Sequence, residues 1–196
     1  MAAVTPSEIN GFWIDETGPA GWFARSDALD QTIRDRFGAA WEQAGELTAA
    51  WKSTPEGMMA ALILTDQFPR NMFRDDPRAF ATDALARALA DEAIGQGFDL
   101  LFPNPQRNFF YLPFEHSEDL ADQDRAVALI AERGTPEHLR HARLHRDTIA
   151  RFGRFPWRNA ALNREPGAEE TALMAAGGYG ALVSGKVSLA EGRALI

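Results

Sequence analysis

Four short sequences that typically begin a helix constrain the fold of this chain more than any other feature. Each places a side chain that accepts a hydrogen bond directly before a proline: Thr5-Pro6, Thr54-Pro55, Asp76-Pro77 and Thr135-Pro136. Such a side chain caps a backbone amide that would otherwise be unpaired, and proline at the first helical position loses no hydrogen bond. Thr5 with Glu8, and Ser188 with Glu191, also have the spacing of a capping box.

The spacing of the apolar residues predicts that helices fill most of the chain. Leu29, Ile33, Phe37 and Trp41 follow one another at intervals of four, as on the buried face of a helix. We expect helices at 27–44, 55–66, 77–94, 118–133, 136–152 and 168–175, with glycines at 45, 95, 134, 153 and 177 as stops. Only the run 108–112 is ambiguous between helix and strand. The sequence therefore predicts an all-α protein.

The length and the short connections predict one domain, residues 1–196. A chain of 196 residues fits a single core. Short connections favour a compact helical bundle or an α–α superhelix. The sequence shows no 34-residue repeat, so a regular solenoid is not supported. The chain has no cysteine, which excludes disulfides and zinc-thiolate sites. We expect a cytoplasmic protein, because no signal peptide and no apolar run long enough for a membrane span is visible.

The charge is unevenly distributed along the chain. The net charge of -8 argues against general nucleic-acid binding. The stretch 138–164 nevertheless holds seven arginines and three histidines against one acid, Asp147. Such an asymmetry predicts internal salt bridges or an anion site. RNA binding through this stretch is a lesser alternative.

The first polar segment of interest is DQFPRN, residues 66–71. Asp66 follows an apolar run, so we expect its carboxylate to be partly buried and Arg70 to be its local partner. Either the pair is a structural clamp, or Asp66, Arg70 and Asn71 bind a ligand. A related sequence, FPWRN at 155–159, lies past a second predicted helix end.

The second segment centres on Glu115 and His116. A histidine between two carboxylates is suited to act as a general base or a metal ligand. Ser117 followed by Glu118 and Asp119 also has the pattern of a helix N-cap with acids in the first turn. The cap explains these three residues without any function, but it leaves Glu115 and His116 unexplained.

The third segment lies in and after the helix predicted at 136–152. His138, His141 and His145 share about one face of this helix, which we interpret as a solvated basic face rather than a metal site, because the intervening arginines repel cations. Arg151, Arg154 and Arg158 suit the recognition of carboxylate or phosphate groups. Alternatively, they pair with acids of the chain, for which we considered Asp66, Glu115, Glu118 and Asp119. The sequence identifies no cofactor and predicts no metal site.

Three blocks in order, DQFPRN (66–71), LPFEHSEDLADQ (112–123) and HRDTIARFGRFPWRN (145–159), resemble the signature blocks of a bacterial domain-of-unknown-function family, number 924. The likeness runs from about residue 8 to about residue 173 and leaves 177–196 as a C-terminal extension. It implies a compact α-superhelical fold related to tetratricopeptide-type helical pairs. The resemblance does not indicate any particular activity. The family pattern more often has histidine where Trp157 stands, so we give Trp157 no catalytic role. The polar positions that follow the family pattern are Asp66, Arg70, Asn71, Glu115, His116, Ser117, Glu118, Gln123, His145, Arg151, Arg154, Arg158 and Asn159.

Two classes of function fit these features. The first is a site, enzymatic or not, for a small and anionic metabolite. Its candidate catalytic residues are Glu115, His116 and His145, and its candidate ligand-binding residues are Asp66, Arg70, Asn71, Arg151, Arg154, Arg158 and Asn159. The second is a tetratricopeptide-like module that binds a protein partner and has no catalytic activity. Metal-dependent chemistry through Glu115, His116 and Glu118 is a lesser alternative.

Overall fold

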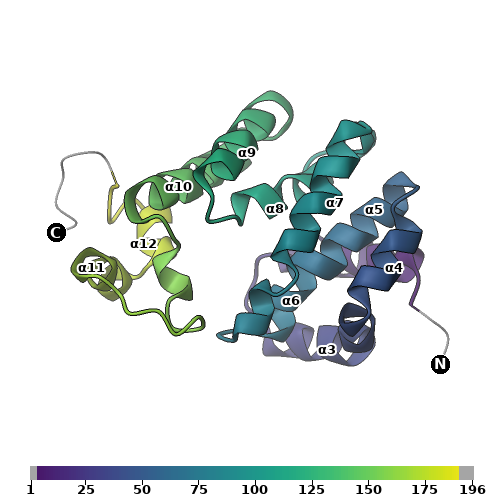
Figure 1. Ribbon diagram of the computed structural model, residues 1–196, viewed down its shortest axis with the longest axis horizontal. Helices are drawn as coiled ribbons and strands as arrows, with labels where there is room; N and C mark the ends of the chain where they lie inside the picture. Colours follow the sequence, from purple (N-terminus) through teal and green to yellow (C-terminus); the bar gives the residue numbers. More distant parts are fainter. Residues whose placement is uncertain (1–3, 190–196) are drawn as a thin grey trace. The chain divides into compact units, whose positions relative to one another are not determined.

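The computed structural model describes residues 4–189, and all the regular elements in this range are helical (Figure 1). The all-α prediction is therefore confirmed. The chain divides into two compact units, Met1–Pro113 and Phe114–Ile196, here called the N-terminal and the C-terminal unit. Each is described by itself, and the expectation of a single domain stays a prediction.

The N-terminal unit contains α1 (Pro6–Asn10), η1 (Gly11–Thr17), α2 (Gly18–Gly21), α3 (Asp27–Glu42), α4 (Ala44–Trp51), α5 (Pro55–Leu62), η2 (Ile63–Gln67), α6 (Phe68–Met72), η3 (Pro77–Phe80), α7 (Asp83–Gly95), η4 (Phe98–Leu101) and η5 (Gln106–Phe110). α8 (Leu112–Glu115) leads into the C-terminal unit. That unit contains α9 (Leu120–Arg133), α10 (Pro136–Phe152), η6 (Pro156–Arg158), α11 (Ala168–Ala176) and α12 (Tyr179–Val183).

The four predicted capping sites are confirmed. The hydroxyls of Thr5, Thr54 and Thr135 each accept a hydrogen bond from the amide three residues later, and the carboxylate of Asp76 accepts one from the amide two residues later. Thr5 and Glu8 form the predicted capping box, with the Thr5 amide 2.8 Å from Oε2 of Glu8. The second expected box involves Glu191, which lies outside the described residues.

Most helix boundaries agree with the sequence, and the differences have local causes. The predicted helix 55–66 changes to a π-helical turn, η2, and Pro69 lies in the first turn of α6 rather than ending a helix. The predicted helix 77–94 is split into η3 and α7 near Thr82, whose hydroxyl donates to the carbonyl of Thr65 over 2.6 Å. The ambiguous run 108–112 is not a strand: it belongs to the 3-10 helix η5 and the start of α8.

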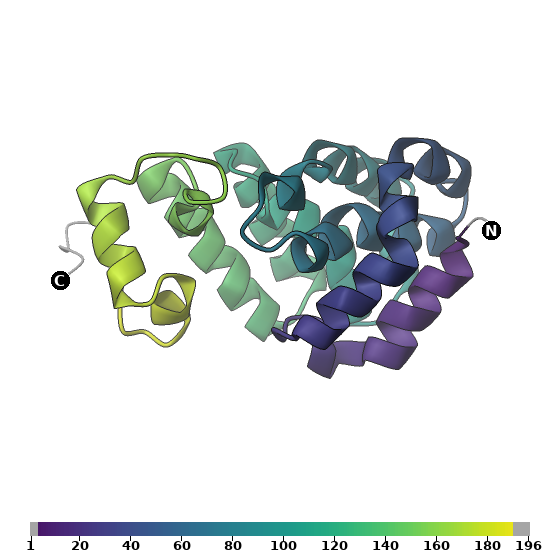
Figure 2. The same cartoon turned by 90° about the horizontal axis from the view of Figure 1, so that it is seen from below.

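Aromatic side chains form the core of the N-terminal unit. α1 and η1 form one continuous helical segment (purple in Figure 2) that carries Phe12 and Trp13 into the interior. Phe68 packs against both of these rings and stacks on Phe37 of α3, with 4.8 Å between the ring centroids. Trp22 is also buried and donates to the carbonyl of Trp13. The tryptophans at 13 and 22 are therefore core residues.

In the C-terminal unit, α9 and α10 lie side by side and are joined by a two-residue turn (Figure 1). α10 ends at Phe152, and the next residue, Gly153, has a φ of 68°, which lies in the left-handed region that favours glycine. α12 packs on α10 and α11, while α11 also contacts η6. The residues of the second and third sequence blocks therefore meet around α10.

Two glycines of the N-terminal unit should respond in opposite ways to alanine. A Cβ at Gly57 would lie 2.0 Å from the carbonyl oxygen of Trp51, whereas a Cβ at Gly38, inside α3, meets nothing within 4 Å. We expect Gly57→Ala to lower the free energy of unfolding by about 2 kcal/mol, through overpacking. Gly38→Ala should raise it by up to about 1 kcal/mol, through helix propensity. Urea unfolding of both variants would measure this, and equal effects would contradict the packing described at Gly57.

A buried carboxylate between two histidines

The polar residues of the first block are held by ion pairs within the N-terminal unit. Asp66 is 1% exposed, and Nη1 of Arg70 lies 3.2 Å from its Oδ1. The same guanidinium lies 3.0 Å from Oδ1 of Asp83. Arg70 is thus confirmed as the local partner of Asp66. Asn71 donates to Oδ1 of Asp30 over 2.8 Å. That these side chains also bind a ligand stays a prediction.

In the C-terminal unit, the turn after α8 is fixed by three anchored carbonyl groups. Nε2 of Gln123 lies 2.6 Å from the carbonyl oxygens of both Glu115 and Ser117. Nη2 of Arg158 donates to the carbonyl oxygen of His116 over 2.9 Å. Backbone polar groups held in this way leave the turn little freedom. The backbone from which the Glu115 side chain extends is therefore held in place independently of the contacts of its carboxylate.

The expected cap at Ser117 is wrong. Asp119 caps α9, because its carboxylate accepts hydrogen bonds from the amides of Ala121 and Asp122. The hydroxyl of Ser117 accepts instead from the amide of Asp119. The helix therefore begins at Leu120, two residues later than predicted.

The anchored turn points the carboxylate of Glu115 at α10. Glu115 is 2% exposed, and its two oxygens accept hydrogen bonds from two histidines. Oε2 lies 2.8 Å from Nε2 of His138, and Oε1 lies 2.6 Å from Nδ1 of His145. These histidines are seven residues apart, so two helical turns bring them to the same face of α10.

Two predicted catalytic residues, Glu115 and His145, thus lie together, while a third member of the cluster was missed. We interpreted the histidine face of α10 as solvated, and for His138 this is wrong because its side chain is buried. The spacing of the histidines predicts that they share a face of the helix, but it does not predict that the carboxylate of Glu115 packs on that face. The ring of His116 lies near that of His145, at 6.4 Å between centroids.

The charge of this cluster follows from its contacts. Burial alone would raise the pKa of Glu115, but the charge of His145 and the hydrogen bonds from His138 and His145 outweigh it and hold the pKa of this carboxyl well below its usual range. Glu115 is therefore ionised, and both imidazoles donate to it. Nδ1 of His138 is buried without a hydrogen-bond partner, so a second N–H at this position would be costly. Of the two imidazoles, His145 is therefore the one whose second nitrogen can carry a proton without burying an unpaired donor.

The other nitrogen of His145 is accessible. Nε2 lies on the side of the ring away from Glu115, has no hydrogen-bond partner in residues 4–189, and is not among the buried polar atoms. Aromatic rings surround the imidazole. Tyr179 stacks on it with 4.7 Å between centroids and 6° between planes, and Phe155 meets it edge-on at 5.3 Å. Trp157 lies at 6.0 Å.

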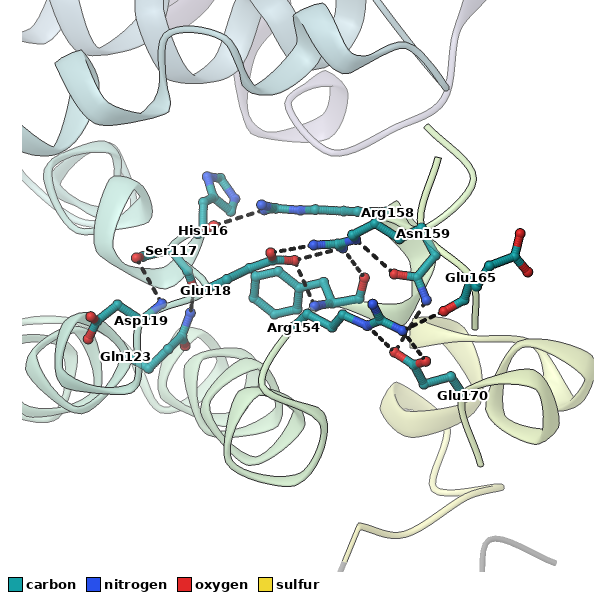
Figure 3. A network of polar contacts seen from close by, with 12 residues as sticks. His116, Ser117, Glu118, Asp119, Gln123, Arg154, Arg158, Asn159, Glu165 and Glu170 are labelled. Atoms are coloured by element: carbon teal, nitrogen blue, oxygen red, sulfur yellow. Dashed lines mark hydrogen bonds and ion pairs between the residues drawn. The ribbon is translucent and has the colours of Figure 1, made fainter. Parts of the chain in front are cut away.

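Two of the predicted ligand-binding arginines, Arg151 and Arg154, form ion pairs within the C-terminal unit, and Figure 3 shows the pair of Arg154. Nε and Nη2 of Arg154 each donate over 2.7 Å to the carboxylate of Glu170, which also accepts from Asn159. Arg151 pairs with Glu169 at 3.0 Å. Internal pairing was the alternative we considered, but the partners of Arg151 and Arg154 are two glutamates of α11 that we had not considered.

A further ion pair and a backbone hydrogen bond hold Glu118 of the second block to the chain after α10. The carboxylate of Glu118 accepts two hydrogen bonds from Arg164, over 2.7 and 3.0 Å, and one from the amide of Phe155 over 2.8 Å (Figure 3). Burial would raise the pKa of Glu118, but these contacts lower it. Arg164 was not predicted as important, because nothing in its local sequence indicates a partner 46 residues away.

An open depression of about 480 Å³ lies over the Arg151 and Arg154 pairs. Its walls are Arg151, Phe152, Arg154 and the segment 167–170. An anion placed there would meet Glu169 and Glu170 together with the guanidinium groups. A role of Arg151, Arg154, Arg158 and Asn159 in ligand binding stays a prediction.

The described range, residues 4–189, also bears on metal binding and on membranes. No group of three histidine or acidic side chains in this range is arranged to hold a metal ion. No helix in it has the length and apolar character required to cross a membrane.

The fold and these contacts define an all-helical protein with a histidine–carboxylate cluster in its C-terminal unit. The chain belongs to the family described as bacterial protein of unknown function DUF924, which matches residues 9–178. A similar solved structure is that of a protein of unknown function, ATU0120, from Agrobacterium tumefaciens. The two chains are 43% identical, with a TM-score of 0.83, over 88% of this chain and 97% of the other. No protein of curated function matches the chain. The expected relation to tetratricopeptide-like folds stays a prediction.

Replacing Glu115 with glutamine should destabilise the protein. The glutamine amide offers one acceptor oxygen and turns an NH₂ group toward the second imidazole N–H, which leaves a buried donor unpaired. We expect Glu115→Gln to lower the free energy of unfolding by about 2 kcal/mol in urea at pH 7. Glu132→Gln is the control, because the side chain of Glu132 on α9 is 68% exposed, and it should change stability by less than about 0.5 kcal/mol. Similar small losses in both variants would contradict the described burial of Glu115.

The Glu170–Arg154 pair predicts a loss of stability in acid. The hydrogen bonds from Arg154 are the largest cause that lowers the pKa of Glu170, to about 2, and the amide of Gly167 and Asn159 assist. A carboxyl with a depressed pKa in the folded state stabilises above its unfolded pKa of about 4.3, and this stabilisation disappears as the pH falls to about 2. The stability difference between wild type and Glu170→Gln should therefore be largest near pH 7 and shrink below about pH 4. Urea unfolding at pH 7, 4 and 2.5 would check this, and a constant difference would exclude the linkage.

Proposed function

We propose that the C-terminal unit holds a small-molecule site in which His145 binds an acidic ligand through Nε2 and exchanges a proton with it. The observation that supports this most is the contact of 2.6 Å between Nδ1 of His145 and the buried Glu115. A carboxylate at one imidazole nitrogen orients the ring and favours its charged form, so the other nitrogen is prepared to give or take a proton.

The charge of the cluster supports an acidic ligand. With the ionised Glu115 at Nδ1, the imidazolium form of His145 offers a charge-assisted N–H group on its accessible side. Such a group binds a carboxylate or phosphate oxygen more strongly than a neutral donor does. The same group is a general acid toward a leaving oxygen or nitrogen, and it becomes a general base once it has lost the proton.

Surrounding contacts give this site the rigidity that proton transfer requires. Gln123 and Arg158 fix the turn that carries Glu115, and Phe155 and Trp157 form an apolar wall beside the imidazole. Arg158 therefore supports the site through the backbone of His116. We also propose a cytoplasmic location, which the lack of cysteine favours.

A thermal-shift screen at pH 6 would test this proposal, with phosphorylated and carboxylated metabolites as probes. A ligand present at 100 times its Kd adds about 2.7 kcal/mol, which corresponds to several degrees of Tm at this size. We expect a shift in the wild type that disappears in His145→Gln. Arg151→Ala is the matched control, because Arg151 lines the open depression and does not contact His145.

The outcomes separate the candidate sites. A shift lost in His145→Gln and kept in Arg151→Ala supports the proposal. The reverse result would move the ligand to the depression. No shift with any acidic probe would contradict the proposal and direct attention to protein partners.

A further inference from the structure

One residue of the cluster lies just outside the region that matches the family. That region ends at residue 178, and Tyr179 is the first residue of α12. Its ring covers one face of the His145 imidazole, nearly parallel to it, with 4.7 Å between the centroids. Its hydroxyl lies 2.6 Å from Nδ1 of His141, which is one turn before His145 on α10. Tyr179 therefore touches two histidines of the same helix.

The direction of the Tyr179–His141 hydrogen bond follows from the two environments. Burial lowers the pKa of His141, so its ring is neutral at pH 7. Burial and the charge of Glu115 raise the pKa of Tyr179, which stays a phenol. The hydroxyl therefore donates, and Nδ1 of His141 accepts. This bond links the far end of the Tyr179 ring to α10.

Two independent contacts then determine how His145 lies. The hydrogen bond to Glu115 fixes one edge of the imidazole, and the stacked ring of Tyr179 fixes its plane. An aromatic face over a cationic ring is also favourable in itself. We propose that Tyr179 is a positioning residue of this site, which holds His145 with Nε2 toward solvent and stabilises its imidazolium form.

The charged and titratable groups around His145 come from several elements, and each has to be considered. Glu115 and His116 belong to the turn after α8, and His138 and His141 to α10 itself. The segment after α10 contributes Arg158, whose guanidinium lies over the Phe155 ring at 4.5 Å. Arg140 lies close enough to affect Tyr179. Of these groups only His141, which loses its donor, contacts the Tyr179 hydroxyl. Tyr179→Leu and Tyr179→Phe both remove that hydroxyl, so a His145 titration that changes in the leucine variant alone would report the aromatic ring.

Imidazole NMR of the full ¹⁵N-labelled chain tests the proposal without any ligand. We expect Tyr179→Leu to lower the midpoint of the His145 titration by about half a pH unit, since an apolar side chain replaces the aromatic face. Tyr179→Phe keeps the stack and should leave that midpoint in place, while the Nδ1 signal of His141 changes because it has lost its donor. Tyr111→Phe is the matched control: it removes a buried tyrosine hydroxyl, bonded to Asp99 over 2.7 Å in the N-terminal unit, and should change neither signal.

An unchanged His145 midpoint in a folded Tyr179→Leu variant would overturn the proposal, as would an equal change in Tyr179→Phe. If Tyr179→Leu does not fold, Tyr179→Met replaces it with the same expectation. The inference rests on the proposed function, because it positions the group assigned there. Its test is separate. A failed ligand screen together with a shifted His145 titration would refute the acidic ligand and keep Tyr179 as the positioning residue. A ligand that binds equally to wild type and Tyr179→Leu, with an unchanged His145 titration, would keep the ligand site and refute the role of Tyr179.

Discussion

The carboxylate of Glu115, removed from water, is the constraint on which the C-terminal unit depends. An isolated buried carboxylate costs several kcal/mol, so the structure has to supply donors in fixed positions. It does so with two imidazoles from one face of α10 and with a turn whose three carbonyl groups are each held by a side chain. If the turn shifted, the carboxylate would lose its donors. The rigidity of the cluster is thus a condition of its burial as well as a preparation for chemistry.

The second and third sequence blocks can be understood as the frame that keeps this turn against α10. Glu118 binds the amide of Phe155 and the guanidinium of Arg164, while Arg158 binds the carbonyl of His116. Both contacts join the turn after α8 to the segment after α10. Many polar residues in these blocks therefore serve the placement of one carboxylate and two histidines. The arginines that seemed suited to an external anion are also paired within the unit, Arg151 and Arg154 with two glutamates of α11.

The sequence predicted features that depend on nearest neighbours along the chain. The caps at Thr54 and Thr135, the bounds of α10 and the Asp66–Arg70 pair all follow from contacts within four residues. It failed where two local solutions compete, as with Ser117 and Asp119, which can both cap the same helix. It also failed where the partner is distant. The spacing of His138 and His145 shows that they share a face, but a face is solvated or buried according to what packs on it, and Glu115 lies 23 and 30 residues away.

Two of the buried carboxylates, Asp66 and Glu115, have different consequences because their partners differ. Asp66 faces Arg70, whose guanidinium keeps its proton at any physiological pH, so that pair can stabilise a turn but cannot pass on a proton. Glu115 faces two imidazoles, the type of side chain whose ordinary pKa lies closest to physiological pH. The buried, partnerless Nδ1 of His138 opposes a second proton there, whereas Nε2 of His145 reaches solvent. His138 and His145 are chemically identical side chains that bind the same carboxylate, yet their roles differ. The difference arises from the surroundings of the ring nitrogen that does not contact Glu115, which is buried in His138 and accessible in His145.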